Sequence, residues 1–431
     1  MIQNRFNQSI NNLITEAAPN GVALAISGGI DSIALLYLFS EWAKLYKIKT
    51  TIFSVNHFLR PESAGDIEFV KRQAQILGHD FYSLNWIHDS SNKSAIQERA
   101  RDARYELMTN QCHKLNISIL ITAHHKDDVL ENYIMRLRKK SGIFGLSYSC
   151  THFINDIQIL RPLLIFYKDE LVNYLHSKKI QWREDCSNQS DSYERNRVRM
   201  QISDFSIDQK NQLLQDIHEC NIQAQNLNKQ LLNVIAEFIH ITKYGFALIN
   251  IEKINHQTDD IKIQVLNYIL TIISGKKHIP RFRSISKILS LLNTNSLINH
   301  SLHGCILKTY NDKLLVFREK KQIDNNLIKK KNGFLWDNRF LFNIDKIDPE
   351  YKIETLNINE LKKLTKKFVF KDLIKIVGNN HKIILLTLPV VKNLEKIIAI
   401  PHIYYYDDIN FKDTWQASFS PCFVSRFTHF L

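Results

Sequence analysis

The sequence predicts an α/β fold for roughly the first 200 residues, then a mainly helical segment and a small α+β segment. The first observation is an alternation of short apolar runs with helix-like segments, which is typical of a parallel sheet with crossover helices. The second is a change near Asp204, after which long helical periodicity dominates. The third is the length of 431 residues, which is too great for one compact core. We therefore expect domains over residues 1–205, 206–320 and 334–431.

Each element of the first domain follows from its periodicity. Residues 33–39 with Trp42 have helical spacing, and residues 66–77 are typical of an amphipathic helix that ends at Gly78. Four apolar runs predict the strands of the sheet. They cover residues 22–26, 50–55, 81–86 and 118–122.

The same reasoning covers the rest of the chain. The middle domain is predicted to contain helices at 209–242, 261–273 and 284–292 and strands at 301–310 and 313–317. The lysine-rich segment 320–333 is expected to be a linker or an exposed turn. In the C-terminal domain we expect a helix at 358–368 and strands at 340–344, 383–388 and 396–401.

Composition limits the class of protein. The formal net charge of +14 favours a polyanionic partner, and RNA, DNA and an anionic membrane surface all fit it. No apolar run approaches the ~18 residues that span a bilayer, and the first residues lack the features of a secretory signal. The six cysteines form no Cys-x-x-Cys pair, which argues against a zinc knuckle, an iron–sulfur site or a disulfide framework. We expect a cytoplasmic protein without a membrane partner.

The most specific motif follows the first predicted strand. It reads Ser27-Gly28-Gly29-Ile30-Asp31-Ser32 and leads directly into a helix; we call residues 27–32 the glycine loop. Two glycines let the backbone turn tightly, and its N–H groups, the serine hydroxyls and the helix N-terminus can together hold phosphate. A plain strand–helix turn with Asp31 as a cap is the simpler interpretation of the glycines alone. The whole hexapeptide favours a phosphate site.

A second motif follows the fourth predicted strand. Here His124 and His125 precede Asp127, Asp128 and Glu131. Asp127 and Glu131 are four residues apart and share one face of a helix, so that both carboxylates could reach Mg²⁺ or a substrate ammonium group. Acids in a first helical turn also complement the helix dipole, and Asp127 could be only a cap.

Other candidate residues are basic. Arg101 and Arg104 lie three apart on one predicted helical face, which suits phosphate, while a solvated face is the simpler explanation. His57 follows the second strand, where the ligand-contacting loops of parallel sheets collect. The candidate RNA contacts, each of which adds salt dependence to binding, are Arg136, Arg138, Arg195, Arg197 and Arg199.

The glycine loop resembles the SGGxDS loop of the PP-loop ATP pyrophosphatases, and further segments resemble the tRNA(Ile)-lysidine synthetases within that superfamily. Residues 123–132 are similar to the family's AHHxDDxxET motif, with Asn132 in place of threonine. The family's RLxRGSGxxGL segment has a counterpart at residues 136–146, where Lys139-Lys140 replace Arg-Gly. Three more segments match the patterns HxLRxxS, RPLL and WxxDxSN…RNxxR; they start at His57, Arg161 and Trp182.

This resemblance implies an activity. The enzyme would use ATP and Mg²⁺ to adenylate the C2 oxygen of the wobble cytidine in tRNA(Ile) with a CAU anticodon. L-lysine would then displace AMP to form lysidine. The oligomeric state stays open, and a homodimer is one possibility.

The resemblance also implies roles for the candidate residues. The residues expected in catalysis are Asp31, Asp127, Asp128, Glu131 and His57, with Asp31 and Asp128 on the metal. Those expected at ATP are Ser27, Gly28, Gly29, Ile30, Asp31, Ser32, Arg101, Arg104 and His124.

Two other classes remain open at this stage. A tRNA 2-thiolase of the same superfamily would share the loop, yet it commonly carries cysteine pairs that are not found here. A non-enzymatic RNA-binding protein on a decayed nucleotide fold predicts loss of the acids at positions 31, 127, 128 and 131, and all four are present. An amidotransferase-coupled synthetase fits less well, because no glutaminase-like half is visible.

Overall fold

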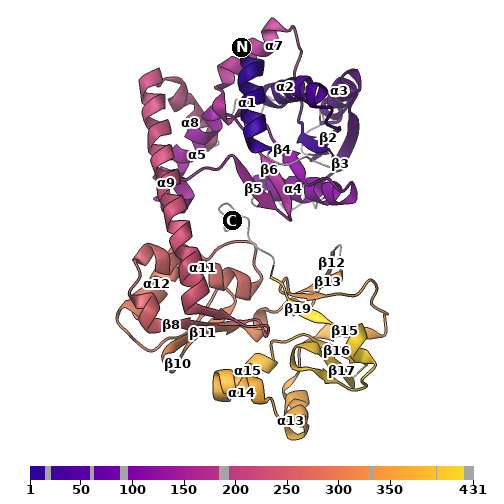
Figure 1. The fold of residues 1–431 in the computed structure, drawn as a ribbon, viewed down its shortest axis with the longest axis vertical. Coiled ribbons are helices and arrows are strands. Elements are labelled where there is room, and N and C mark those ends of the chain that lie inside the picture. Colours follow the sequence, from indigo (N-terminus) through magenta and orange to yellow (C-terminus); the bar gives the residue numbers. More distant parts are fainter. Residues whose placement is uncertain are drawn as a thin grey trace. The chain divides into compact units, whose positions relative to one another are not determined.

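A computed structural model describes residues 1–14, 21–58, 63–87, 96–183, 194–330, 333–394 and 396–421 (Figure 1). The described chain divides into two compact units, residues 1–225 and residues 226–421. Each unit is described by itself. The three domain boundaries expected from the sequence stay a prediction.

The first unit contains a six-stranded sheet in the order β3-β2-β1-β4-β6-β5. All neighbouring strands are parallel except β5, which is antiparallel to β6. The prediction of an α/β domain with a parallel sheet is therefore confirmed, and each of the four predicted strands is present. The strands are β1 (Val22–Ala25), β2 (Thr50–Asn56), β3 (Asp80–Asn85), β4 (Ile119–Ile121), β5 (Thr151–Ile154) and β6 (Ile157–Leu160).

Helices cover both faces of this sheet because successive strand residues point to opposite sides. Val22 and Leu24 of β1 share a core with α1, α2, α3 and α7, whereas Ala23 belongs to a second core with α4. A third core joins α5 and α8. These helices are α1 (Ile2–Leu13), α2 (Ile30–Tyr46), α3 (Ser63–Ile76), α4 (Ile96–Lys114), α5 (Lys126–Arg138), α7 (Lys168–Ser177) and α8 (Glu194–Ser203).

The long helix α9 (Ile207–Phe238) begins in the first unit and ends in the second. After it, a five-stranded antiparallel sheet has the order β7-β8-β11-β10-β9. The helices predicted in this region are present as α11 (Asp259–Ser274) and α12 (Phe282–Asn293), beside the short α10 (Ile251–Asn255). The strands are β7 (Ile239–Ile241), β8 (Phe246–Asn250), β9 (Asn299–Leu302), β10 (Cys305–Tyr310) and β11 (Lys313–Arg318).

The middle region thus contains more strand than its helical periodicity indicates. The single strand predicted over 301–310 is a hairpin of β9 and β10, because His303 and Gly304 both take positive φ and turn the chain. In the segment predicted as a linker, residues 327–330 form β12 (Leu327–Lys330), which pairs with β13 (Gly333–Trp336).

The remainder of the second unit holds two small antiparallel sheets, β12-β13-β14-β19 and β15-β16-β17-β18. The predicted helix is present as α13 (Ile358–Lys367), but the strand predicted over 383–388 is wrong. That segment begins within the short helix α15 (His381–Leu385), and an unbroken apolar run does not by itself distinguish a buried strand from a buried helix. The other elements are β14 (Phe340–Phe342), β15 (Tyr351–Glu354), β16 (Val390–Asn393), β17 (Lys396–Ile400), β18 (Tyr405–Tyr406), β19 (Ala417–Phe419), α14 (Lys371–Val377) and α16 (Phe411–Thr414).

One hydrophobic core runs through this second unit. It contains Phe246 and Leu315 from the five-stranded sheet together with Trp336, Phe340 and Leu385 from the segments that follow. The regions on either side of residues 320–333 therefore bury apolar surface against each other.

Candidate active site

The glycine loop joins the carboxyl end of β1 to α2, whose N-cap is Gly29. Gly28 has a φ of +93°, and a side chain there would also meet Val70 Cγ2 at 3.4 Å. The hydroxyl of Ser32 lies inside the loop, where it accepts the Gly28 N–H at 3.1 Å and donates to Gly29 O at 2.9 Å. The loop is therefore held in a tight turn at a helix N-terminus, the geometry that binds phosphate.

Three acids from two helix N-termini surround the buried side chain of His125, which is the N-cap of α5. Its Nε2 lies 3.6 Å from Asp31 Oδ1 and 3.6 Å from Asp128 Oδ2, and its Nδ1 lies 3.4 Å from Asp127 Oδ2. Burial disfavours the imidazolium, but the acids outweigh it and raise the pKa of His125 to about 10. We call these four residues the acid–histidine cluster; its histidine is positively charged at neutral pH.

The acids of this cluster differ in their other partners. Asp127 Oδ2 accepts the Lys168 N–H at 2.8 Å, and Asp128 Oδ2 accepts the backbone N–H of His125 at 3.0 Å. Asp31 Oδ1 is buried and has no hydrogen-bond partner among the described residues. Burial opposes ionisation of Asp31, yet His125 lowers its pKa below the ordinary value. Asp31 is thus an ionised carboxylate whose Oδ1 faces the charged His125 ring.

Glu131 and Asp128 are also bound by two arginines of α8. Arg195 donates to Glu131 Oε2 at 2.6 Å and to Asp128 Oδ1 at 2.5 Å, and Arg199 donates to Glu131 Oε1 at 2.8 Å. The Glu131 side chain is 1% exposed. Two residues expected at RNA and two expected in catalysis therefore form one ion-pair network.

His124 lies beside several positive charges. Burial lowers the pKa of this histidine far below its ordinary value, and nearby arginines lower it further. The ring is therefore neutral, and Thr122 Oγ1 lies 3.0 Å from its Nδ1. The arginines are Arg161, Arg101, Arg104 and Arg195. Arg195 pairs with acids of this site. The other three arginines give a positively charged region beside His124, which suits an anion.

Sequence reasoning missed two residues of this arrangement as site residues. His125 is the centre of the acid–histidine cluster, and its position next to His124 in the motif was the available signal. Arg161 is buried, donates to Ser149 O at 3.0 Å and lies 4.9 Å from the Tyr148 ring centroid. The sequence feature that could have indicated Arg161 as a site residue is its position at the start of the RPLL segment.

The other candidate residues lie on neighbouring segments of the first unit. His57 follows β2, the strand next to β1, and packs edge-on against Trp86. On α5, Arg136 is half-buried and Arg138 is exposed, with a hydrogen bond from Arg138 to Gln201. Arg197 is exposed on α8. Any RNA contact of these residues stays a prediction.

Lys139 and Lys140, which stand where the family pattern has Arg-Gly, keep the local turn. Lys140 takes a φ of +51°, the region that favours the glycine usual at this place, and Lys139 pairs with Glu194 at 3.1 Å. The departure from the family pattern thus leaves a left-handed residue after α5.

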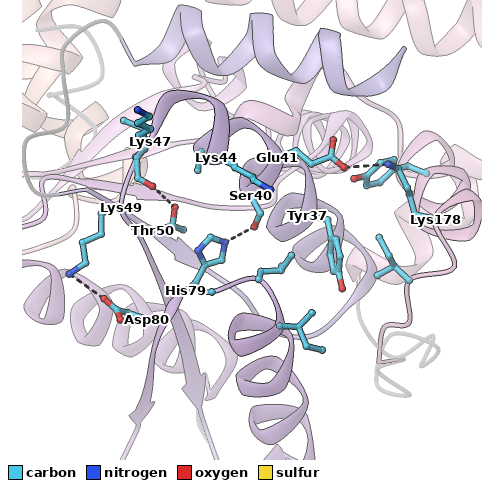
Figure 2. Close-up of a pocket in the computed structure, with 17 residues that line it drawn as sticks. Tyr37, Ser40, Glu41, Lys44, Lys47, Lys49, Thr50, His79, Asp80 and Lys178 are labelled. Carbon is cyan, nitrogen blue, oxygen red and sulfur yellow. Dashed lines mark hydrogen bonds and ion pairs between the residues drawn. The ribbon is translucent and has the colours of Figure 1, made fainter.

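A cavity of about 970 Å³ lies at the opposite edge of the sheet (Figure 2). It is lined by the starts of β2 and β3 and by the ends of α2, α3 and α7. Lys49 pairs there with Asp80, and Lys178 with Glu41. Lysines near helix C-termini offset the negative end of the helix dipole, so this cavity has a structural explanation.

Within the described residues, no group of three or more His, Cys, Asp or Glu side chains is arranged to hold a metal ion by itself. Mg²⁺ does not need one, since it is usually held by one or two carboxylates together with substrate phosphates and water. Asp31, whose Oδ1 accepts no hydrogen bond from the described residues, is a carboxylate of this site that fits that mode. No helix within the described ranges is long and apolar enough to cross a membrane.

A parallel sheet whose glycine loop opens onto a helix N-terminus beside clustered acids defines a PP-loop protein, and the family model described as "PP-loop domain" matches residues 2–205. Two curated relatives are named tRNA(Ile)-lysidine synthase. The one from Rickettsia bellii (strain RML369-C) is 42% identical and the one from Rickettsia prowazekii (strain Madrid E) is 41% identical, each over 100% of both chains. The chain therefore belongs to the tRNA(Ile)-lysidine synthase family.

Solved structures are more distant. The U34-tRNA thiolase NcsA from Methanococcus maripaludis with its [4Fe-4S] cluster has a TM-score of 0.43 and 14% identity, over 50% of this chain and 77% of that chain. A likeness of this size carries no argument about function.

Proposed function

We propose that this chain attaches L-lysine to C2 of the wobble cytidine in the CAU anticodon of tRNA(Ile), with ATP as the activating substrate. The lysidine formed would change the codon that the tRNA reads from AUG to AUA. The observation that carries the proposal is the position of Asp31. It belongs both to the glycine loop and to the acid–histidine cluster, so one carboxylate links a phosphate site to the acids of α5.

Activation of the cytidine depends on charge neutralisation around ATP. The loop N–H groups and the first turn of α2 would hold the pyrophosphate end, and Arg101, Arg104 and His124 would contact the nucleotide. Mg²⁺, held by Asp31 with Asp128 and by the phosphates, would supply positive charge against the leaving pyrophosphate. The neutral His124 ring can donate a hydrogen bond there without itself carrying charge.

The second step joins the ε-amino nitrogen of lysine to C2, breaks the bond from C2 to the adenylated oxygen, and releases AMP. The amine must lose a proton before it can attack, so a carboxylate or a histidine must hold it and accept that proton. Asp127 and Glu131 are our candidates for holding the lysine.

Glu131 is bound by arginines in the described structure, which suggests how its use is linked to RNA. RNA phosphate is a strong partner for guanidinium groups. We propose that tRNA binding draws Arg195 and Arg199 towards phosphate and leaves Asp128 and Glu131 for the cation and the lysine. Arg136, Arg138 and Arg197 would add backbone contacts. We also propose that the reaction takes place in the cytoplasm. The molecular mass of the protein in solution would show whether it forms a homodimer.

A 2-thiolase has less support. The full-length relatives carry the lysidine synthase name. Among the cysteines in the described ranges, Cys112 and Cys305 are buried, and burial raises the pKa of both thiols to about 12, so neither is an effective nucleophile.

The test is transfer of labelled lysine to a tRNA(Ile) transcript with a CAU anticodon, in the presence of ATP and Mg²⁺. We expect label in the RNA and release of AMP and pyrophosphate, and no transfer to the same transcript with a GAU anticodon. Asp31→Ala should reduce pyrophosphate release at least about 100-fold, whereas Asp102→Ala, at an exposed acid on α4, should leave it unchanged. Absence of transfer, under conditions in which a known lysidine synthase succeeds, rejects the proposal.

A further inference from the structure

The second unit contains a smaller cavity of about 490 Å³, within the size range of sites for small ligands. Its walls come from the β7–β8 turn, from the turn that connects β17 with β18, and from β19. We call it the Tyr404 pocket. The lining residues that carry the argument are Lys243, His402, Tyr404, Gln416, Ser418 and Phe419.

Tyr404 is the exposed aromatic residue of this pocket. Its side chain is 65% exposed, and its φ of +55° is a conformation that a bulky residue adopts only where its surroundings impose it. The backbone N–H of Tyr404 donates to Pro401 O at 3.1 Å and so fixes the turn. The fold therefore holds an aromatic ring towards solvent, which favours a binding role over a packing role.

Lys243 lies against this ring. Its Nζ is 4.4 Å from the Tyr404 ring centroid and 3.3 Å from Tyr404 Oη, and it lies 5.3 Å from the Tyr244 ring. None of the described residues that line the pocket is acidic. The positive charge next to the ring is therefore available to an anionic group of a ligand.

Neutral polar groups complete the pocket. His402 is 4% exposed, and neither of its ring nitrogens has a hydrogen-bond partner among the described residues. Burial lowers the pKa of His402 to about 3, so its ring is neutral and has one donor and one acceptor. The side chains of Gln416 and Ser418 are exposed at the rim.

An exposed ring for stacking, a cation for phosphate and neutral hydrogen-bonding groups are the features that bind a single unpaired nucleotide. A metal ion would need acids, which this lining lacks. We propose that the Tyr404 pocket binds one unpaired nucleotide of the tRNA, with the base stacked on Tyr404 and the adjoining phosphate at Lys243. This inference rests on the proposed function, which supplies tRNA as the partner.

The test compares full-length variants in equilibrium binding to the tRNA(Ile) transcript at several salt concentrations. Tyr404→Ala should weaken binding roughly tenfold or more, and Tyr404→Phe should retain it, because stacking needs the ring and not the hydroxyl. Tyr46→Ala, at an exposed tyrosine of α2, is the control and should bind as the wild type does.

Lys243→Gln gives a second and independent readout. Loss of one phosphate contact should reduce the slope of log affinity against log salt by about 0.7 to 0.9, whereas Tyr404→Ala should leave that slope unchanged. In both variants, lysine transfer at saturating tRNA should keep the wild-type rate, since neither residue belongs to the active site.

The outcomes separate this inference from the proposed function. Wild-type lysine transfer together with unchanged affinity and slope in both variants overturns the pocket and leaves the function intact. A wild-type chain that neither binds nor modifies the transcript rejects both. If Tyr404→Ala fails to fold, ultraviolet cross-linking of the wild-type protein to the transcript tests the pocket instead. An adduct on the peptide that contains Tyr404 supports the pocket, and adducts confined to other peptides overturn it.

Discussion

Arg195 donates from Nε to Glu131 Oε2 at 2.6 Å, although the two residues are 64 positions apart in the chain. The pair joins α8 to α5, and Glu131 is almost completely buried. A buried carboxylate depends on such partners because water cannot solvate its charge. The arginines of α8 and the acids of α5 therefore act as one unit.

Arg195→Ala should lower the free energy of unfolding by about 1–3 kcal/mol, because it leaves buried Glu131 and Asp128 with fewer donors. The arginine side chain is 36% exposed, so the loss should be smaller than for a fully buried pair. Urea unfolding measures this loss of unfolding free energy. Arg283→Ala, at an exposed arginine of α12, should stay within about 0.5 kcal/mol of wild type. Equal effects of the two substitutions would contradict the network, as would a double variant with Glu131→Gln that recovers no stability.

The raised pKa of His125 predicts a pH-dependent contribution to stability. The pKa is about 10 in the folded chain and 6.5 ordinarily, so the stabilisation is complete below pH 6.5 and is lost as the pH rises to about 10. The difference in unfolding free energy between wild type and His125→Asn should therefore shrink steadily across that window. His240→Asn serves as the control for loss of an exposed imidazole. A difference that stays constant from pH 6.5 to 10 would rule out the ionised histidine.

Gly28→Ala should disturb the glycine loop. The residue has a φ of +93°, so alanine there is strained by about 1–2 kcal/mol, and its methyl group would lie in contact with Val70. We expect a higher KM for ATP in pyrophosphate exchange together with a lower melting temperature. Gly65→Ala is the matched control, because nothing lies within 4 Å of a side chain there and the site is in α3, where alanine gains about 0.5 kcal/mol. Normal exchange in Gly28→Ala would show that the loop tolerates a side chain.

Asp337 contacts two buried arginines of the second unit, Arg318 and Arg339. Arg318 Nη2 donates to Oδ1 at 2.8 Å and Arg339 Nε donates to Oδ2 at 2.6 Å. Asp337→Asn keeps the shape and removes the charge, so it should cost about 3–5 kcal/mol by leaving two buried guanidinium groups without an anionic partner. Thermal unfolding against Asp345→Asn, at an exposed acid, checks this. A fall in melting temperature no larger than that of the control would contradict a stabilising role for the Asp337 charge.

Much of the fold and part of the site could be predicted because their signals are local. Strands β1 to β4 follow from contiguous apolar runs, and the glycine loop is six consecutive residues at the end of one of them. The charged groups of α5 were also visible, since a helix places residues four apart on one face. The strand expected over 383–388 failed because an apolar run carries no period that separates strand from helix.

The sequence by itself determined the parallel sheet, the phosphate loop and the family, because each depends on residues that are neighbours in the chain. Only the tertiary structure decided that His125 is the centre of three acids and that Glu131 is bound by Arg195 and Arg199. It also decided that Asp31 Oδ1 is buried beside His125 without accepting a hydrogen bond from the described residues. These properties depend on burial and on which charges lie within a few ångströms, and both are set when distant segments pack together.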